Sequence, residues 1–192
     1  MLRILFLFLL LFCTACGRSA PTFYYTLTSE TSLQALSPLP QKTIRLAKVA
    51  IPQYLDRQNI VSRKENSVEL NVDPLQIWAE PLGDGIRRIL QQELTEPLLR
   101  KNLLVLPLGS EEGGNFVLYV DVLKFDGALG HNIELIAQWT LIQPSRNVTV
   151  NNGIFKKVAK PIDTSYKAFV QTQSILTQQL AQAILANLPT LR

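Results

Sequence analysis

The chain is poor in cysteine, and the little it has lies at one end. Its 192 residues include two cysteines, Cys13 and Cys16, and none follows them. A domain built from the later residues therefore has no disulfide framework, no cysteine nucleophile and no thiolate zinc site. We expect its stability to come from a packed core.

Histidine and concentrated charge are equally scarce. His131 is the only histidine, which leaves few ligands for a metal site. The chain has 19 Lys and Arg against 15 Asp and Glu, a formal net charge of +4, but no basic run exceeds a pair. Nucleic-acid binding usually needs a concentrated basic patch, so we expect no nucleic-acid partner.

The N-terminus has the pattern of an export signal. Arg3 precedes an apolar run at residues 4–12, which is too short to span a bilayer, and the chain then turns polar. Ala15 followed by Cys16 resembles the lipobox of bacterial lipoproteins. That resemblance implies cleavage before Cys16, diacylglycerol on its sulfur and an acyl chain such as palmitate on its new amine. The alternatives are an ordinary secretory signal with an incidental cysteine and a transmembrane anchor.

Patterns of alternating and β-branched residues predict strands along most of the chain. Residues 23–28 are aromatic and β-branched, and residues 43–51 alternate apolar with polar side chains up to Pro52. Hairpin turns are expected at residues 64–66 and 126–130. The remaining strands are expected at residues 59–63, 67–72, 103–106, 116–125, 133–142, 146–150 and 153–159.

Two segments have the spacing of amphipathic helices. The first is expected to begin after a lead-in at residues 74–82, and Pro97 should end or kink it near Thr95. The second should be capped by Asp163 or Thr164. Its expected apolar face comprises Tyr166, Phe169, Val170, Leu176, Leu180, Ala183, Ile184 and Leu188, and its polar face Gln171, Gln173, Gln178, Gln179 and Gln182.

These elements predict an α+β fold: an antiparallel or mixed β-sheet with two amphipathic helices packed on one face, in a single domain. Hydrophobic residues make up 47% of the chain and charged residues 18%, which is typical of a folded protein. We expect a lipoprotein signal peptide at residues 1–15, a lipidated tether at 16–22 and one domain at 23–192.

No motif identifies catalytic chemistry, a metal or a cofactor. His131 follows the expected turn, and no serine has the G-x-S-x-G surroundings of a hydrolase nucleophile. The motif Gly83-Asp84-Gly85 lacks the lysine of a P-loop and the third glycine of a dinucleotide site, and it favours helix entry instead. Asp56 and Glu80 would act as paired carboxylates only if the fold brought them together. We therefore expect no enzyme, no metal and no cofactor.

Several segments in order resemble the ABC-type transport auxiliary lipoprotein family, which includes the PqiC-like intermembrane transport lipoproteins. After the lipobox come Tyr24-Tyr25-Thr26-Leu27, then Val49-Ala50-Ile51-Pro52-Gln53-Tyr54-Leu55-Asp56-Arg57, and then Trp78-Ala79-Glu80-Pro81-Leu82. The later Phe125-Asp126-Gly127, Trp139 and the long helix after Tyr166 are similar to the same family. The resemblance covers nearly the whole chain after Cys16.

The resemblance implies a role in the envelope of a Gram-negative bacterium. Such lipoproteins accompany ABC transporters and mammalian-cell-entry (MCE) domain proteins that move lipids or other hydrophobic substrates between the two membranes. It implies that the lipoprotein holds the outer-membrane end of an MCE assembly and that several copies of it form a ring. The lipoprotein itself would not hydrolyse ATP. Gly17 would follow the acylated Cys16, and the absence of aspartate there favours the outer membrane over the inner membrane.

Four residues of the matching segments are candidates for partner contact or domain core: Tyr54, Leu55, Trp78 and Pro81. The alternative function is an envelope lipoprotein that binds cell-wall polymer or activates a cell-wall synthase. A periplasmic hydrolase that uses His131 is a third candidate.

Overall fold

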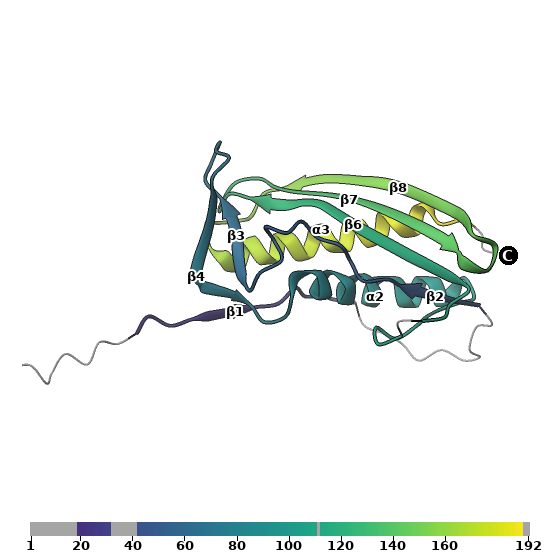
Figure 1. Ribbon diagram of the computed structural model, residues 1–192. Helices are drawn as coiled ribbons and strands as arrows, with labels where there is room; N and C mark the ends of the chain where they lie inside the picture. Colours follow the sequence, from purple (N-terminus) through teal and green to yellow (C-terminus); the bar gives the residue numbers. More distant parts are fainter. Residues whose placement is uncertain (1–18, 32–41, 111, 190–192) are drawn as a thin grey trace, which may run out of the picture.

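The structure is a computed structural model that describes residues 19–31, 42–110 and 112–189. It shows a single α+β domain with mixed sheets and two long helices, as expected from the sequence (Figure 1). The elements in chain order are β1 (Phe23–Tyr25), β2 (Lys42–Leu46), β3 (Asn59–Arg63), β4 (Leu70–Trp78), α2 (Leu82–Arg100), β5 (Leu103–Val105), β6 (Phe116–Gly127), β7 (Ile133–Gln143), η2 (Pro144–Arg146), β8 (Val148–Ala159) and α3 (Tyr166–Asn187).

The strands form two sheets. A five-stranded sheet has the order β5-β2-β6-β7-β8, in which β2 is parallel to β5 and β6, and β6, β7 and β8 form an antiparallel meander. A three-stranded sheet has the order β1-β4-β3, with β1 parallel and β3 antiparallel to β4. The three-stranded sheet lies at one end of the molecule, where the N-terminal segment leaves the domain (Figure 1).

The alternating pattern of the central strands has the expected cause. Along β7, every second side chain from Ile133 to Leu141 is buried, and the residues between them are half-buried or exposed. Strand geometry sends successive side chains to opposite faces, so one face of the sheet reaches the core and the other faces outward. The β6–β7 hairpin is confirmed, with paired residues from Val117↔Ile142 to Gly127↔Ile133.

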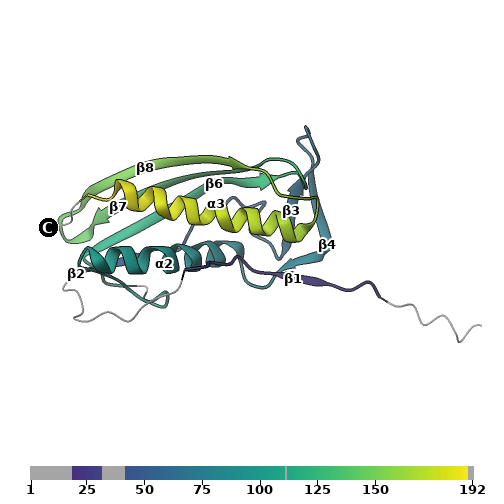
Figure 2. The same ribbon diagram turned by 180° about the vertical axis from the view of Figure 1, so that it is seen from behind.

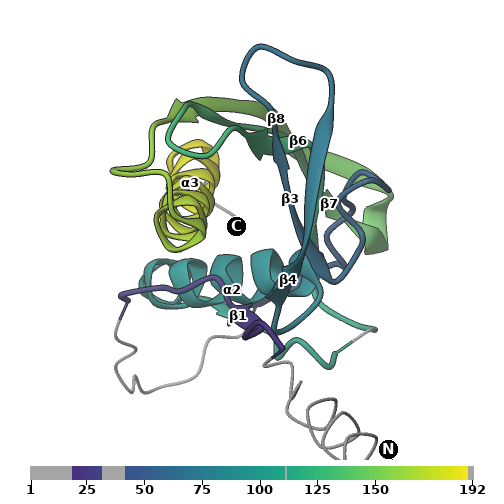
Figure 3. The same cartoon turned by 90° about the vertical axis from the view of Figure 1, so that its left-hand side faces the viewer.

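Both helices lie on the same side of the five-stranded sheet and pack against each other (Figures 2 and 3). The buried residues of α2 include Ile86, Ile89 and Leu90 at helical spacing, and those of α3 include Phe169, Leu176 and Leu180. Together with the inner face of the sheet they form one apolar core. Neither helix in the described ranges combines the length and apolarity needed to cross a membrane.

The helix end predicted near Thr95 is wrong. The helix α2 continues through Pro97 to Arg100. A proline in the interior of a helix removes one backbone hydrogen bond and normally kinks or ends the helix. Here the last turn also buries the side chain of Leu98, and we infer that this burial offsets the lost hydrogen bond.

Two expectations for α3 are also wrong. The N-cap is Ser165, whose hydroxyl accepts a hydrogen bond from the Ala168 amide at 3.1 Å, whereas Asp163 accepts one from the Ser165 amide at 2.7 Å in the turn before it. Gln173 does not lie on a polar face: it is 1% exposed, and its amide donates to the Phe125 carbonyl at 3.2 Å.

Several strand boundaries differ from the expected ones; the first strand, for example, ends at Tyr25 and not at residue 28. Of the lead-in expected over residues 74–82, residues 74–78 belong to β4 and Leu82 begins α2. The strand expected over residues 43–51 ends at Leu46, although Ala50 still bridges to Asp121. The two segments expected at 146–150 and 153–159 form the single strand β8.

Candidate functional site

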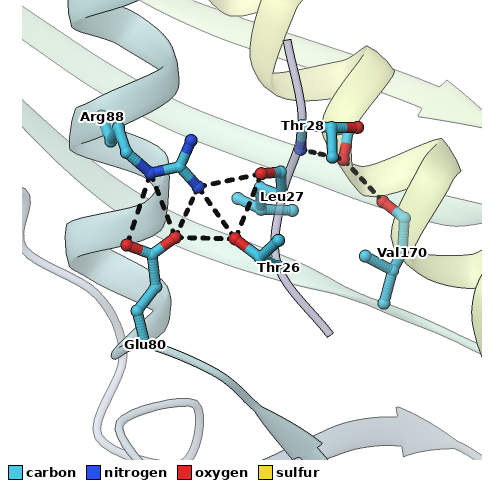
Figure 4. A network of polar contacts seen from close by, with 7 residues as sticks. Thr26, Leu27, Thr28, Glu80, Arg88 and Val170 are labelled. Atoms are coloured by element: carbon cyan, nitrogen blue, oxygen red, sulfur yellow. Dashed lines mark hydrogen bonds and ion pairs between the residues drawn. The ribbon is translucent and has the colours of Figure 1, made fainter. Parts of the chain in front are cut away.

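The segment after β1 crosses the two helices and is fixed there by polar contacts (Figure 4). We call this group the N-terminal clasp and define it as Thr26, Leu27, Thr28, Glu80, Arg88 and Ser174. It joins the start of the domain to the loop before α2, to α2 itself and to α3.

Arg88 is the centre of the clasp. Its guanidinium forms an ion pair with Glu80 at 2.5 Å and donates to the Leu27 carbonyl at 2.9 Å. The same group donates to the Thr26 hydroxyl at 2.9 Å, and that hydroxyl donates to Glu80 at 2.8 Å. Gly85 leaves space for this arrangement, because a Cβ there would lie 3.3 Å from the Glu80 carboxylate.

The electrostatics of the clasp favour the ionised carboxylate. The pKa of Glu80 lies below its ordinary value of 4.5, chiefly because Arg88 donates hydrogen bonds to it, with a further contribution from Thr26. Burial acts in the opposite direction but is outweighed. Glu80 therefore stays charged and holds the guanidinium in place at neutral pH.

The contacts to α3 complete the clasp. The Thr28 amide donates to the Ser174 hydroxyl at 3.2 Å, and Gln178 donates to the Thr28 carbonyl at 3.2 Å. Between these polar contacts, the Leu27 side chain is buried in the core. Residues 26–28 are thus held by both their backbone and their side chains.

A second polar cluster, the sheet junction, consists of Tyr54, Arg63 and Asp126. Arg63 ends β3 and binds Asp126 of β6 through both carboxylate oxygens, at 2.5 and 3.0 Å. The Tyr54 hydroxyl also donates to Asp126, and the Arg63 guanidinium carbon lies 5.9 Å from the centre of the Tyr54 ring. Because the Asp126 side chain is 0% exposed, these partners compensate a charge that has lost its water.

The sheet junction also changes the acidity of its tyrosine. Burial, together with hydrogen bonding to Asp126, raises the pKa of Tyr54 to about 12. The phenol is therefore protonated at neutral pH and acts as a hydrogen-bond donor to Asp126. The cluster therefore has the chemistry of a structural link between the two sheets.

The structure places the four candidate residues in different environments. Trp78 is 6% exposed and Leu55 is also buried, so both belong to the core. Tyr54 is half-buried in the sheet junction, and Pro81 is exposed at the N-cap of α2. Cys16 lies outside the described residues, so its acylation stays a prediction.

The residues weighed for chemistry do not come together. His131 lies 3.2 Å from Glu65, and both side chains are about half exposed. Glu80 is engaged by Arg88, whereas Asp56 is an exposed residue of the turn after β2. Within the described ranges there is no group of three or more residues suited to hold a metal ion.

Sequence reasoning missed Arg63, Asp126 and Arg88 as joining residues. Strand alternation places Asp126 on the outward side of β6, the side of Lys124, and only the arrival of Arg63 and Tyr54 buries it. Arg88 lies on the polar side of its helix, and no local pattern indicates what covers that side. The one sequence feature that points to Asp126 as a joining residue is its charge directly after the apolar residue Phe125.

Two solved structures share the fold of this chain. The crystal structure of an uncharacterized protein is 22% identical, with a TM-score of 0.68, and the match covers 87% of this chain and 98% of that one. A protein from Xanthomonas campestris is 17% identical, with a TM-score of 0.66, and the match covers 85% of this chain and 93% of that one. No curated protein gives a significant match.

The sequence profile of the ABC-type transport auxiliary lipoprotein component matches residues 25–185. That range begins at the last residue of β1 and ends within α3, so it includes β2 to β8, the whole of α2 and most of α3. The chain therefore belongs to the ABC-type transport auxiliary lipoprotein family.

Proposed function

We propose that this protein is an outer-membrane-anchored periplasmic lipoprotein and an accessory subunit of an MCE/ABC-type system that transports lipids or other hydrophobic substrates between membranes. The observation that carries the proposal is the family match over residues 25–185. The lipobox-like Ala15-Cys16 pair at the end of an export signal supports it independently.

The anchor follows from the proposed acylation of Cys16. Each buried methylene contributes roughly 0.8 kcal/mol, and stable attachment needs more than one acyl chain. A triacylated Cys16 meets that requirement without a membrane-spanning helix. Residues 17–22 would then connect the membrane to β1.

The proposed role is non-catalytic, with the domain acting as a binding partner. His131 forms only a solvent-exposed pair with Glu65, which does not resemble a hydrolase site. The partner would be an MCE-domain protein, met by a ring of copies of this chain. Of the four candidate residues, Pro81 is exposed and Tyr54 is partly exposed, so these two are the ones available for partner contact.

The proposal is tested by extracting the full-length protein in detergent from its own cells by a C-terminal affinity tag. Mass spectrometry of the N-terminal peptide and of the co-purifying proteins gives the two readouts, and the mass of the complex gives the copy number. We expect a triacylated Cys16, an MCE-domain partner and an oligomer. A Cys16→Ala variant is the matched control, and it should leave the outer-membrane fraction.

Each negative result has a distinct meaning. An unmodified Cys16 in the wild type would contradict the anchor. An acylated Cys16 that co-purifies only with cell-wall enzymes or peptidoglycan would contradict the transport role and favour the cell-wall alternative.

A further inference from the structure

The first strand of the domain exposes two aromatic side chains next to the proposed anchor. Phe23 is 49% exposed and Tyr24 is 68% exposed. Both belong to β1, which extends from the body of the domain toward the N-terminus (Figure 1). Adjacent residues of a strand point to opposite sides, so the two rings lie on the two faces of β1.

The strand is rigidly held although its side chains are exposed. Phe23 and Tyr24 pair with Gln76 and Ile77 of β4. The Ala79 amide donates to the Tyr25 carbonyl at 2.7 Å, and the N-terminal clasp fixes the residues that follow. Two exposed rings on a fixed strand lose little conformational freedom when they bind a surface.

The short chain between β1 and the proposed anchor at Cys16 favours the lipid bilayer as the surface that the two rings bind. Seven peptide units join Cys16 to Phe23, and a fully extended chain of that length spans at most about 25 Å. An acylated Cys16 therefore keeps Phe23 within about 25 Å of the anchored residue, so that β1 can reach the headgroup layer. Tyrosine and phenylalanine rings are suited to that layer, because the apolar ring can contact acyl chains and the tyrosine hydroxyl can bind headgroups or water.

The three-stranded sheet that contains β1 also exposes apolar side chains at its other side. The β3–β4 hairpin exposes Val68, Leu70 and Val72. With the two rings of β1 these are five of the twelve large apolar side chains exposed in the described ranges. The strands β3 and β4 form the three-stranded sheet with β1 at one end of the molecule, whereas the loop that joins them points away from β1 (Figures 1 and 3).

We propose that Phe23 and Tyr24 insert into the headgroup region of the membrane that holds the lipid anchor, so that β1 fixes the orientation of the domain on that membrane. The inference rests on the proposed acylation of Cys16. The occupant of this surface is a lipid bilayer. The rings add apolar contact to the anchor and convert a loose tether into a defined attachment.

The test uses the full-length acylated protein reconstituted in phosphatidylethanolamine–phosphatidylglycerol vesicles with brominated acyl chains. A Tyr24→Trp variant carries a fluorescent probe on β1, and Phe23→Trp is a second probe. Tyr119→Trp is the matched control, because Tyr119 is exposed on β6, away from β1. Trp78 and Trp139 are buried and provide a constant background.

We expect brominated lipid to quench roughly half of the added emission at positions 23 and 24, because interfacial side chains lie about 5–10 Å into the headgroup and acyl boundary. The control at position 119 should keep its emission. Unquenched probes on a protein that floats with the vesicles would overturn the inference and leave the anchor intact. A blue shift that depends only on protein concentration would instead assign β1 to protein contact.

A protein that does not float with the vesicles would have a different meaning. It would overturn the proposed anchor, and the membrane contact of β1 would fail with it. Flotation and quenching are read from the same samples, so the two failures are distinguishable.

Discussion

Arg88 connects the N-terminal strand to the helical layer through a single side chain. Its guanidinium contacts the Leu27 carbonyl, the Thr26 hydroxyl and the Glu80 carboxylate. Charge-assisted hydrogen bonds are stronger than neutral ones, and a planar guanidinium can serve several acceptors at once. The consequence is that the ionised state of Glu80 contributes to holding the segment that carries β1.

Glu80→Gln should therefore reduce the fall in unfolding free energy that the wild type shows between pH 7 and pH 3. Because Arg88 lowers the pKa of Glu80 in the folded protein below 4.5, the charged carboxylate stabilises the fold above that pH, and this contribution is lost as pH falls through the lowered value. Since the pair is partly exposed, we expect a loss of about 0.5–1 kcal/mol at pH 7. Urea unfolding at pH 7, 5 and 3 gives the measurement.

An exposed carboxylate provides the control for this experiment. Asp56→Asn removes a negative charge from the turn after β2 and should leave the difference between pH 7 and pH 3 near that of the wild type. Equal pH dependence in Glu80→Gln and the wild type would contradict the role assigned to the pair.

At the scale of whole elements, the sequence predicted those helices and strands whose apolar residues follow a regular spacing. The alternation of β6 and β7 and the spacing of α2 are set by which side faces the core, so they could be read directly. The positions of Pro97 inside a helix and of Gln173 inside the core could not be predicted in this way, because they depend on contacts with other elements. The buried Leu98 extends α2 past its proline, and the Phe125 carbonyl gives Gln173 a partner inside the core.

The β6–β7 hairpin depends on Gly127 for close backbone approach. A Cβ at residue 127 would lie 2.2 Å from the Asn132 carbonyl oxygen and 2.6 Å from the Ile133 Cα, both in the facing backbone. Gly127→Ala should therefore force the two strands apart and cost about 1–3 kcal/mol of unfolding free energy. Thermal denaturation should show a clear fall in Tm.

Gly109→Ala is the matched control for the hairpin variant. A Cβ there would meet no atom within 4 Å. Its Tm should stay close to that of the wild type. A Gly127→Ala protein as stable as Gly109→Ala would show that the hairpin can relax without cost.

On the scale of the whole molecule, two clusters of contacts between distant segments hold the end with β1 against the rest of the domain: the N-terminal clasp reaches the helices, and the sheet junction reaches the five-stranded sheet. The N-terminal clasp joins residues 61 and 62 positions apart, and the sheet junction joins residues 63 and 72 positions apart. Neither separation follows from a helix or strand period, so no pattern in the chain could have indicated them. The family resemblance includes Tyr54 and Asp126 in similar segments but gives no reason for pairing them.

Asp126→Ala should loosen the three-stranded sheet from the rest of the domain. The substitution leaves Arg63 without its carboxylate and Tyr54 without its acceptor; because Arg63 is partly exposed, we expect a loss of about 2–3 kcal/mol. Native-state hydrogen exchange should show β3 and β4 losing more protection than β7 and β8. Tyr54→Phe, which keeps the ion pair, should cost about 1 kcal/mol with little local change. A uniform loss of protection over both sheets in Asp126→Ala would mean that the domain unfolds as one unit, and that the sheet junction contributes stability without acting as a separate link.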